Sequence, residues 1–255
     1  MNAILSKMLA THEGVAVCWL GNLSWLLYAE GRLIAFDLDL HSALRLQPSP
    51  IPVEELAPVL DVHFITHEHG DHFNGTTSGI LAAHSECCFV VPANCVEKAH
   101  SVGLTDARIH VARPREPFDL PDLHVTPMRA LHGHANFSVY RHANLDDCGY
   151  CFTFGGTTFL QPGDSVLLHD HLDFPGVDVL FVSPTVHNMY IDRSAVLINA
   201  LEPAFIFPQH FDTYTEFDDN RFWTKGYPDE LKAALSTSLQ ARFHKLKQGE
   251  VFVIE

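Results

Sequence analysis

The chain has 255 residues, of which 47% are hydrophobic and 18% are charged, an ordinary balance for a globular protein. No run approaches the roughly eighteen apolar residues that a membrane helix needs, and Glu13 and Gly14 interrupt the N-terminus, so no secretion signal is expected. The formal net charge of −15 disfavours broad electrostatic binding to nucleic acid or anionic membranes. We therefore expect a single cytoplasmic domain spanning residues 1–255.

The first third of the chain is predicted to begin with strands. Residues 15–20, 24–29 and 32–38 are rich in β-formers, and Gly21-Asn22 and Glu30-Gly31 supply the turns between them. The elements expected next are a short helix at 52–60 broken by Pro58, a buried strand at 62–66, a helix at 76–84, a strand at 88–91 and a helix at 93–101.

The remainder mixes strands and helices. Gly155-Gly156 predicts a hairpin turn between two strands, and Asp192 is expected to cap a helix. The expected strands are 108–112, 123–131, 150–154, 157–161, 177–182, 205–208 and 251–254, and the expected helices are 192–201 and 228–239. This order favours two mixed sheets packed face to face with helices outside, an α+β fold with four αββα layers.

Histidine and cysteine are the residue types that point to chemistry. Eighteen histidines in an acid-rich chain are typical of an imidazole-and-carboxylate metal site. Of the six cysteines, Cys148 and Cys151 form a C-x-x-C, but no second pair accompanies it. We therefore interpret the cysteines as buried or loop thiols.

The strongest signal is the segment 64–72, Phe-Ile-Thr-His-Glu-His-Gly-Asp-His. An apolar strand ends at Thr66, and four metal-ligand side chains follow within six residues. His67 and His69 alternate in extended backbone, so both can bind one ion. A turn at Gly70 can direct Asp71 and His72 toward a second ion. The alternative, a polar loop with solvated histidines, is disfavoured by this density of ligands after a buried strand.

Three later residues also end β-like runs: His132, Asp164 and His210. Strand ends at one rim of a sandwich can converge on one site. Each residue has a plainer interpretation by itself, as a surface histidine or, for Asp164, a turn residue in Gly-Asp-Ser. The first cluster favours the metal interpretation for all three.

The segment 67–72 resembles the HxHxDH signature of the metallo-β-lactamase superfamily, and His132, Asp164 and His210 follow in the family's order. The short chain and Pro-Gln-His-Phe at 208–211 are most similar to the branch of L-ascorbate-6-phosphate lactonase and related metal-dependent hydrolases. Asn22 stands where many relatives carry histidine, Leu38 where proline is common, and His187 in a loop that is often glycine-rich.

The resemblance implies a metallo-β-lactamase fold with two divalent metal ions, most readily zinc, with manganese and iron as alternatives. It implies one site of His67, His69 and His132. The second site would consist of Asp71, His72 and His210. Asp164 would bridge both ions, and Asp37 would lie behind a ligand and fix its tautomer. His134 competes with His132 for the third ligand position, and we prefer His132 because it directly ends the apolar run.

The activity implied is hydrolysis of a small-molecule ester, lactone or phosphodiester by a metal-bridged hydroxide, with a lactonase-like reaction favoured. Asp71 is expected to orient the attacking water or pass its proton to the leaving group. His187 is a candidate to bind substrate or donate a proton, although an exposed loop histidine is equally compatible with the pattern. Arg113 and Arg115 are interpreted as solvated loop residues rather than phosphate contacts.

Three other functions compete with this interpretation. A phosphodiesterase, phospholipase D-like enzyme or nuclease would use the same metals, but a nuclease usually adds a basic surface that a net charge of −15 does not suggest. A flavin-linked di-iron oxidoreductase requires a glutamate where His69 stands. A non-catalytic metal-binding sensor is disfavoured because every expected ligand position is filled. The substrate can be anionic because bound metals offset local charge, and a homo-oligomer is compatible with the sequence.

Overall fold

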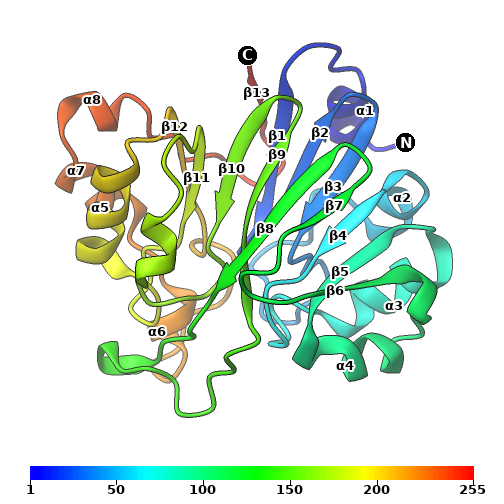
Figure 1. Cartoon of the computed structure of the whole chain (residues 1–255), viewed down its shortest axis with the longest axis horizontal. Helices are drawn as coiled ribbons and strands as arrows, with labels where there is room; N and C mark the ends of the chain where they lie inside the picture. The colour runs from blue at the N-terminus through cyan, green and yellow to red at the C-terminus, as the bar shows by residue number, and fades with distance from the viewer. The chain divides into compact units, whose positions relative to one another are not determined.

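The computed structural model describes all residues from Met1 to Glu255. The chain divides into two compact units. The first unit comprises residues 1–112 and 246–255, and the second unit comprises residues 113–245. Each unit contains one mixed β-sheet with helices (Figure 1).

The first unit is built on a seven-stranded sheet in the order β13-β1-β2-β3-β4-β5-β6. Strands β13, β1, β2 and β3 are antiparallel, whereas β3 to β6 are parallel. The parallel strands therefore all end at one edge of the sheet, where ligands commonly bind. The strands are β1 (Val15–Gly21), β2 (Ser24–Ala29), β3 (Arg32–Phe36), β4 (Val62–Phe64), β5 (Cys88–Pro92), β6 (Ile109–Ala112) and β13 (Val251–Ile254).

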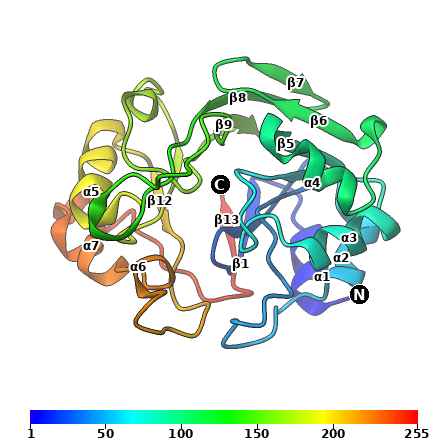
Figure 2. The same cartoon turned by 90° about the horizontal axis from the view of Figure 1, so that it is seen from below.

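Helices cover this sheet and complete its apolar core. They are α1 (Ala3–Leu9), α2 (Val53–Leu56), α3 (Gly75–His84) and α4 (Val96–Ser101), and Figure 2 shows α3 and α4 beside β5 and β6. Leu5 and Met8 of α1 pack with Ala16 and Cys18 of β1, while Leu81 of α3 joins the same cluster. This buried apolar surface fixes the sheet from which the motif loop after β4 emerges.

The second unit is built on a six-stranded sheet in the order β12-β11-β10-β9-β8-β7. Strands β7 to β10 are antiparallel, whereas β10, β11 and β12 are parallel. Consequently β8, β10, β11 and β12 all run in the same direction and end at one edge. The strands are β7 (Phe118–Leu120), β8 (Leu123–Arg129), β9 (Cys148–Phe154), β10 (Thr157–Gln161), β11 (Val179–Val182) and β12 (Phe205–Pro208).

Both faces of this second sheet are apolar. On one face Leu160, Leu180 and Ile206 pack with Leu197 and Ile198 of a long helix. The alternate residues form an aromatic row, in which Phe152 stacks on Phe159 at 5.1 Å and Phe181 lies 6.0 Å from Phe207. Such near-continuous apolar strands are typical of sheets covered on both faces.

Four helices belong to the second unit. They are α5 (Tyr190–Leu201), α6 (Arg221–Thr224), α7 (Pro228–Ala234) and α8 (Thr237–Gln240). Figure 1 shows α5 and α7 side by side, and Leu231 of α7 joins the cluster around Leu197. No helix in the structure combines the length and the apolar character needed to cross a membrane.

Most predicted elements are confirmed, but two helices differ from their predicted bounds, and α1, α6 and β7 were not predicted. The helix predicted at 192–201 begins at Tyr190, so Asp192 lies in its first turn rather than at the cap. The helix predicted at 228–239 is broken, because Ser236 caps a separate helix, α8. Helix α1 was not predicted, although Asn2 caps it by accepting hydrogen bonds from the amides of Ile4 and Leu5.

The burial of His63 in β4 leads to a prediction about how the stability of the protein depends on pH. His63 is fully buried, its Nε2 accepts a 3.1 Å hydrogen bond from the amide of Leu38, and burial lowers its pKa from 6.5 to about 3. In the unfolded chain this histidine is protonated below about pH 6.5, whereas in the folded chain it stays neutral down to about pH 3. The free energy of unfolding therefore falls as the pH drops from about 6.5 to about 3.

His63→Gln keeps an acceptor for Leu38 but cannot titrate. Its free energy of unfolding, measured with urea at several pH values between about 6 and 4, should fall less steeply than that of the wild type, by up to ~1.4 kcal/mol per pH unit. Parallel curves for the two proteins would show that His63 does not take up this proton on unfolding.

Candidate metal centre

The motif loop, residues 65–74, joins β4 to α3 in the first unit and is anchored at both ends. Ile65 continues the strand by donating its amide to Val90 O at 2.9 Å, and the buried ring of Phe73 fixes the far end. Asn74 caps α3, its side chain accepting from the amide of Thr77 at 2.9 Å. The four predicted ligands thus lie on a short segment with a fixed course.

Three imidazoles of this loop are packed against one another. The ring centroids of His67 and His69 lie 4.6 Å apart, and those of His67 and His72 lie 4.0 Å apart. His67 and His72 are buried, and Nε2 of His72 lies 3.3 Å from Oδ2 of Asp71. The structure therefore brings together all four residues of the predicted first cluster.

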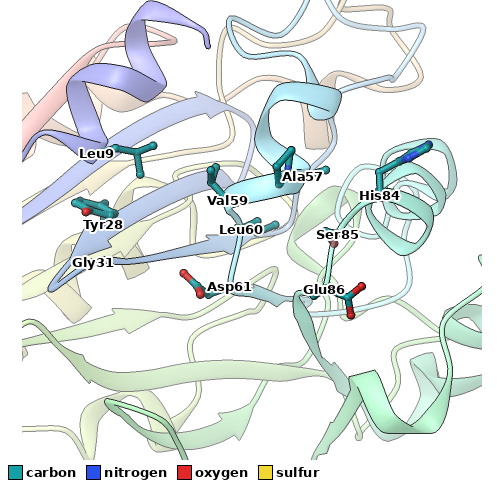
Figure 3. Close-up of a pocket in the computed structure, with 11 residues that line it drawn as sticks. Leu9, Tyr28, Gly31, Ala57, Val59, Leu60, Asp61, His84, Ser85 and Glu86 are labelled. Carbon is teal, nitrogen blue, oxygen red and sulfur yellow. The ribbon is translucent and has the colours of Figure 1, made fainter.

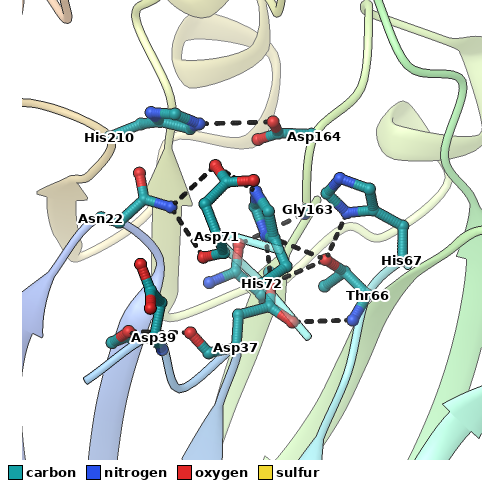
Figure 4. A network of polar contacts seen from close by, with 12 residues as sticks. Asn22, Asp37, Asp39, Thr66, His67, Asp71, His72, Gly163, Asp164 and His210 are labelled. Atoms are coloured by element: carbon teal, nitrogen blue, oxygen red, sulfur yellow. Dashed lines mark hydrogen bonds and ion pairs between the residues drawn. The ribbon is translucent and has the colours of Figure 1, made fainter. Parts of the chain in front are cut away.

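Asp37, which follows β3, fixes the orientation of two of these rings. Its buried carboxylate accepts from the amide of Thr66 at 2.8 Å, from the hydroxyl of Thr66 at 2.6 Å, and from Nδ1 of His72 at 2.9 Å (Figure 4). Because the hydroxyl hydrogen of Thr66 goes to Asp37, its oxygen accepts from Nδ1–H of His67 at 3.1 Å. Both histidines therefore carry their hydrogen on Nδ1 and present the Nε2 lone pair that a metal ligand needs.

Asn22 holds the acidic member of the loop. Its side-chain amide donates to the backbone oxygen of Asp71 at 3.0 Å and to Oδ2 of Asp71 at 3.3 Å (Figure 4). Asn22 has φ of 50° and Asp37 has φ of 43°, a left-handed conformation that asparagine and aspartate adopt more readily than most residues. Asn22 thus lies directly beside a predicted ligand.

In the second unit the four loops that leave the common edge after β8, β10, β11 and β12 carry His132, Asp164, His187 and His210. Oδ2 of Asp164 lies 2.7 Å from Nε2 of His187, 3.3 Å from Nε2 of His210 and 3.5 Å from Nε2 of His132. One ligand atom each from His132, Asp164 and His187 lies within 4.8 Å of the others. The structure therefore brings the predicted ligands His132 and His210 to the carboxylate of the third, Asp164.

The hydrogen bonds of His132 show that its Nε2 lone pair faces this carboxylate. Nδ1 of His132 donates to Gly133 O at 2.6 Å, whereas Nε2 of His187 donates to Oδ2 of Asp164 at 2.7 Å. A neutral imidazole that donates from Nδ1 has only a lone pair at Nε2. Lone pairs facing a carboxylate oxygen repel it unless a proton or metal cation lies between them, and imidazole with carboxylate is a ligand set that zinc, manganese and iron accept. The residues present therefore fit a metal ion.

His187 is buried, which excludes the alternative of an exposed loop histidine. Burial lowers its pKa from 6.5 to about 4, against the opposing effect of Asp164. Its direct partner in the structure is the Asp164 carboxylate, and its predicted catalytic role remains a prediction. The neighbouring Asn188, for which the sequence offers no distinguishing signal, donates to Oδ1 of Asp164 at 2.8 Å.

His132 and His134 differ in what they face. His132 faces Asp164, whereas the ring of His134 stacks on Tyr140 at 5.5 Å and lies 4.9 Å from the ring of Phe222. This geometry favours His132 over His134 as the ligand. His134 instead belongs to an aromatic cluster with Tyr140 and Phe222, which lies beside the loops that carry the ligands.

A reciprocal amide pair supports the loops that carry Asp164 and His210. The side chains of Gln161 and Gln209 donate to each other at 2.9 and 2.7 Å, and both are fully buried. Gln209 also donates to the hydroxyl of Ser183 at 3.1 Å. This network ties the ends of β10, β11 and β12 together.

Two further features lie away from this chemistry. A hollow of about 610 Å³ in the first unit adjoins Leu60 and Asp61 at the start of β4, whereas the ligand loop follows the end of that strand (Figure 3). Arg115 is an exposed loop residue, as expected, and it also pairs with the buried Asp170 at 2.8 Å, together with Arg129 at 2.7 Å. The hydrogen bonds and positive charge of Arg129, and to a smaller extent those of Arg115, hold the pKa of Asp170 well below its usual range.

The family model described as a beta-lactamase superfamily domain matches residues 35–211. The chain belongs to this superfamily. It is 25% identical over 246 residues to a UPF0173 metal-dependent hydrolase of Hyperthermus butylicus, covering 92% of this chain and 98% of the relative.

Solved structures show the same fold. A metallo hydrolase from Ignicoccus hospitalis matches with a TM-score of 0.73 and 19% identity, over 94% of this chain and 98% of that one. An isothiocyanate hydrolase from Delia radicum gut bacteria matches with a TM-score of 0.71 and 18% identity, over 94% of this chain and 99% of that one. The predicted metallo-β-lactamase fold, with its two mixed sheets and helices, is thus confirmed.

The hydroxyl of Thr66 can be tested without altering a ligand. Thr66→Val removes the bond to Asp37 and the acceptor for His67 while preserving the shape of the side chain. We expect a loss of about 1–3 kcal/mol in the free energy of unfolding, because two buried polar groups lose a partner. Thr66→Ser retains the hydroxyl and should keep most of the stability; equal losses in the two variants, measured with urea, would contradict the role of the hydroxyl.

Gly133 tests the close contact between two ligand loops of the second unit. A Cβ at this position would lie 1.6 Å from the backbone oxygen of His187, whereas a Cβ at Gly75 would meet nothing within 4 Å. We expect Gly133→Ala to lower the free energy of unfolding by about 3 kcal/mol or more through this overlap, and Gly75→Ala to leave it nearly unchanged. Thermal unfolding of both variants checks this; a Gly133→Ala protein as stable as the wild type would contradict the close approach of the two loops.

Proposed function

We propose that the protein is a hydrolase that uses two divalent metal ions, and that the two units form one catalytic domain. The observation that carries the proposal is the shared arrangement of the two ligand sets, in which a histidine Nε2 faces a carboxylate while Nδ1 is held by an acceptor. His72 shows it with Asp71, and His132 shows it with Asp164.

The ligand assignment follows the pattern of the superfamily. His67, His69 and His132 would hold one ion, Asp71, His72 and His210 the other, and Asp164 both. Zinc suits this set best, with manganese and iron as the alternatives. When bound, the ions would supply Lewis acidity and a water activated for attack at neutral pH.

The remaining roles belong to groups that this chain holds in place. Asp37 and Thr66 keep His72 and His67 in the tautomer that leaves Nε2 able to bind. Asn22 directs the Asp71 carboxylate, which we assign to orient the attacking water or to accept its proton for the leaving group. His187 and Asn188 hold Asp164; His187 is also close enough to take or return a proton at an Asp164 oxygen.

The substrate we propose is a small molecule with an ester, lactone or phosphodiester bond, with lactones favoured by the resemblance to the ascorbate-phosphate lactonase branch. The metal-dependent hydrolase among the relatives supports the reaction class. All six cysteines are unpaired, which supports a reducing cytoplasmic location, and the charge of −15 argues against nucleic acid as the substrate.

The proposal is tested by elemental analysis and by hydrolysis of a panel of substrates. The panel contains an aryl ester, a γ-lactone, a phosphodiester and an aryl isothiocyanate, the last because a structural neighbour is an isothiocyanate hydrolase. We expect about two bound metal ions per chain and turnover of at least one class, abolished by a chelator and restored by zinc or manganese.

Asp71→Ala should lower kcat/KM on the order of 100-fold or more and reduce the metal content, because the variant lacks both a ligand and the group that orients the water. Asp192→Ala is the matched control, since the side chain of Asp192 is 69% exposed on α5. A wild-type protein that retains metal but turns over no class would instead support a metal-binding sensor.

A further inference from the structure

The loop after His132 returns to that histidine. Residues 134–142, here named the return loop, lie between β8 and β9. Gly133 and Val139 form an isolated antiparallel bridge, and the amide of His134 donates to Ser138 O at 2.7 Å. The amide of Tyr140 then donates to His132 O at 2.9 Å, which brings the ring of Tyr140 to 5.5 Å from the ring of His132.

The rings of this loop form a continuous aromatic wall. Tyr140 is stacked with His134 at 5.5 Å and an interplanar angle of 14°, and the edge of His142 meets it at 5.5 Å and 74°. On its other side, His134 lies 4.9 Å from Phe222. Because Phe222 O also accepts from the backbone amide of His187 at 3.2 Å, the wall is tied to two of the loops that converge on Asp164.

The return loop encloses a hollow of about 440 Å³, a volume within the range of small-molecule sites. Its lining contains no carboxylate, although the chain has 31 acidic residues and only 16 lysines and arginines. The lining residues are His134, Ser138, Val139, Tyr140, Arg141 and His142. The hollow is therefore a locally non-acidic surface on a strongly acidic protein.

Arg141 supplies the positive charge of this hollow. Its Nε donates to Nε2 of His142 at 2.7 Å, which orients the guanidinium, and no carboxylate of the chain pairs with it. Arg115 and Arg129, by contrast, are both committed to Asp170. The terminal nitrogens of Arg141 thus retain the planar pair of donors that binds carboxylate or phosphate through two hydrogen bonds.

We propose that the return loop is the specificity subsite of the enzyme, with Arg141 binding an anionic group of the substrate and the Tyr140–His134 wall packing against a flat portion next to it. The inference rests on the proposed function, because it takes His132 as a metal ligand and the hollow as its neighbour. It narrows the substrate class to small molecules that carry a carboxylate or phosphate beside a planar group. The ring contact between Tyr140 and His132 places this subsite next to the reacting bond.

The test measures binding by calorimetry on the metal-loaded full-length protein, so that it does not depend on turnover. The probes are phenyl phosphate, benzoate and the neutral benzyl alcohol. Arg141→Gln is compared with the wild type and with Arg113→Gln, which removes an exposed arginine of the same unit that does not line the hollow. Circular dichroism and the thermal midpoint establish that both variants are folded.

We expect Arg141→Gln to weaken binding of at least one anionic probe about tenfold, equivalent to ~1.4 kcal/mol, and to leave benzyl alcohol unaffected. The anion that loses more affinity identifies the group, phosphate or carboxylate. Arg141→Lys should recover part of the loss, since it restores the charge but not the planar pair of donors. Arg113→Gln should bind all three probes as the wild type does.

An unchanged affinity for both anions in Arg141→Gln, or an equal loss in Arg113→Gln, would overturn the subsite whatever the protein hydrolyses. Turnover of neutral esters by the wild type, together with unchanged affinity for both anions in Arg141→Gln, would leave the hydrolase proposal standing and overturn only the anionic substrate class. Absence of bound metal and of all turnover in the wild type would instead overturn the proposed function. The two proposals therefore fail on different measurements.

Discussion

Burying a carboxylate is unfavourable unless donors or cations surround it, and this requirement organises the ligand loops of each unit. Asp37 satisfies it with donors alone: an amide, a hydroxyl and an imidazole N–H. Asp164 accepts from Asn188 at one oxygen and from His187 at the other, but the Nε2 lone pair of His132 also faces it. The first carboxylate is therefore complete within the protein, while the second is arranged for a cation.

This difference separates a supporting residue from a ligand by physical criteria. The oxygens of Asp37 are occupied by donors from Thr66 and His72, so Asp37 is not a ligand itself. It acts by fixing the rings of His72 and, through Thr66, of His67, so that their Nε2 atoms can bind. Asp164 gathers three loops from the ends of different strands, and the Gln161–Gln209 amide pair beneath them resists their separation. The left-handed φ of 62° at His210 shows that the backbone accepts strain to present this ring.

The sequence was sufficient for the fold and for the first cluster because both depend on local pattern. The HxHxDH segment follows a buried strand, and strand ends are visible as a change from apolar to polar residues. The same signal located His132, Asp164 and His210 one at a time. Their convergence on one carboxylate depends on parallel pairing of β10, β11 and β12, which no local pattern encodes.

Other features of the site had no signal in the sequence. Asn188 and the return loop act through contacts that arise only once the chain is folded, and the ion pair of Arg115 was not foreseen because its partner, Asp170, is 55 residues away. The helix break at Leu235 and Ser236 was missed because a serine cap inside a helical pattern looks like an ordinary polar position. Thr66 carries no distinguishing signal either, because a threonine at a strand end is common, and its hydroxyl matters only through its contacts with Asp37 and His67 in the folded chain.

The pairing of β13 with β1 has a consequence for how the molecule is assembled. It makes the first unit discontinuous along the chain, since the whole second unit is inserted between β6 and β13. During synthesis, β1 would remain an open sheet edge until residues 251–254 arrive, whereas the second unit is continuous and can form its own sheet earlier. Closing so long a loop makes the β1–β13 ladder a slow, late step, and the nascent protein is most exposed to edge-to-edge aggregation before it.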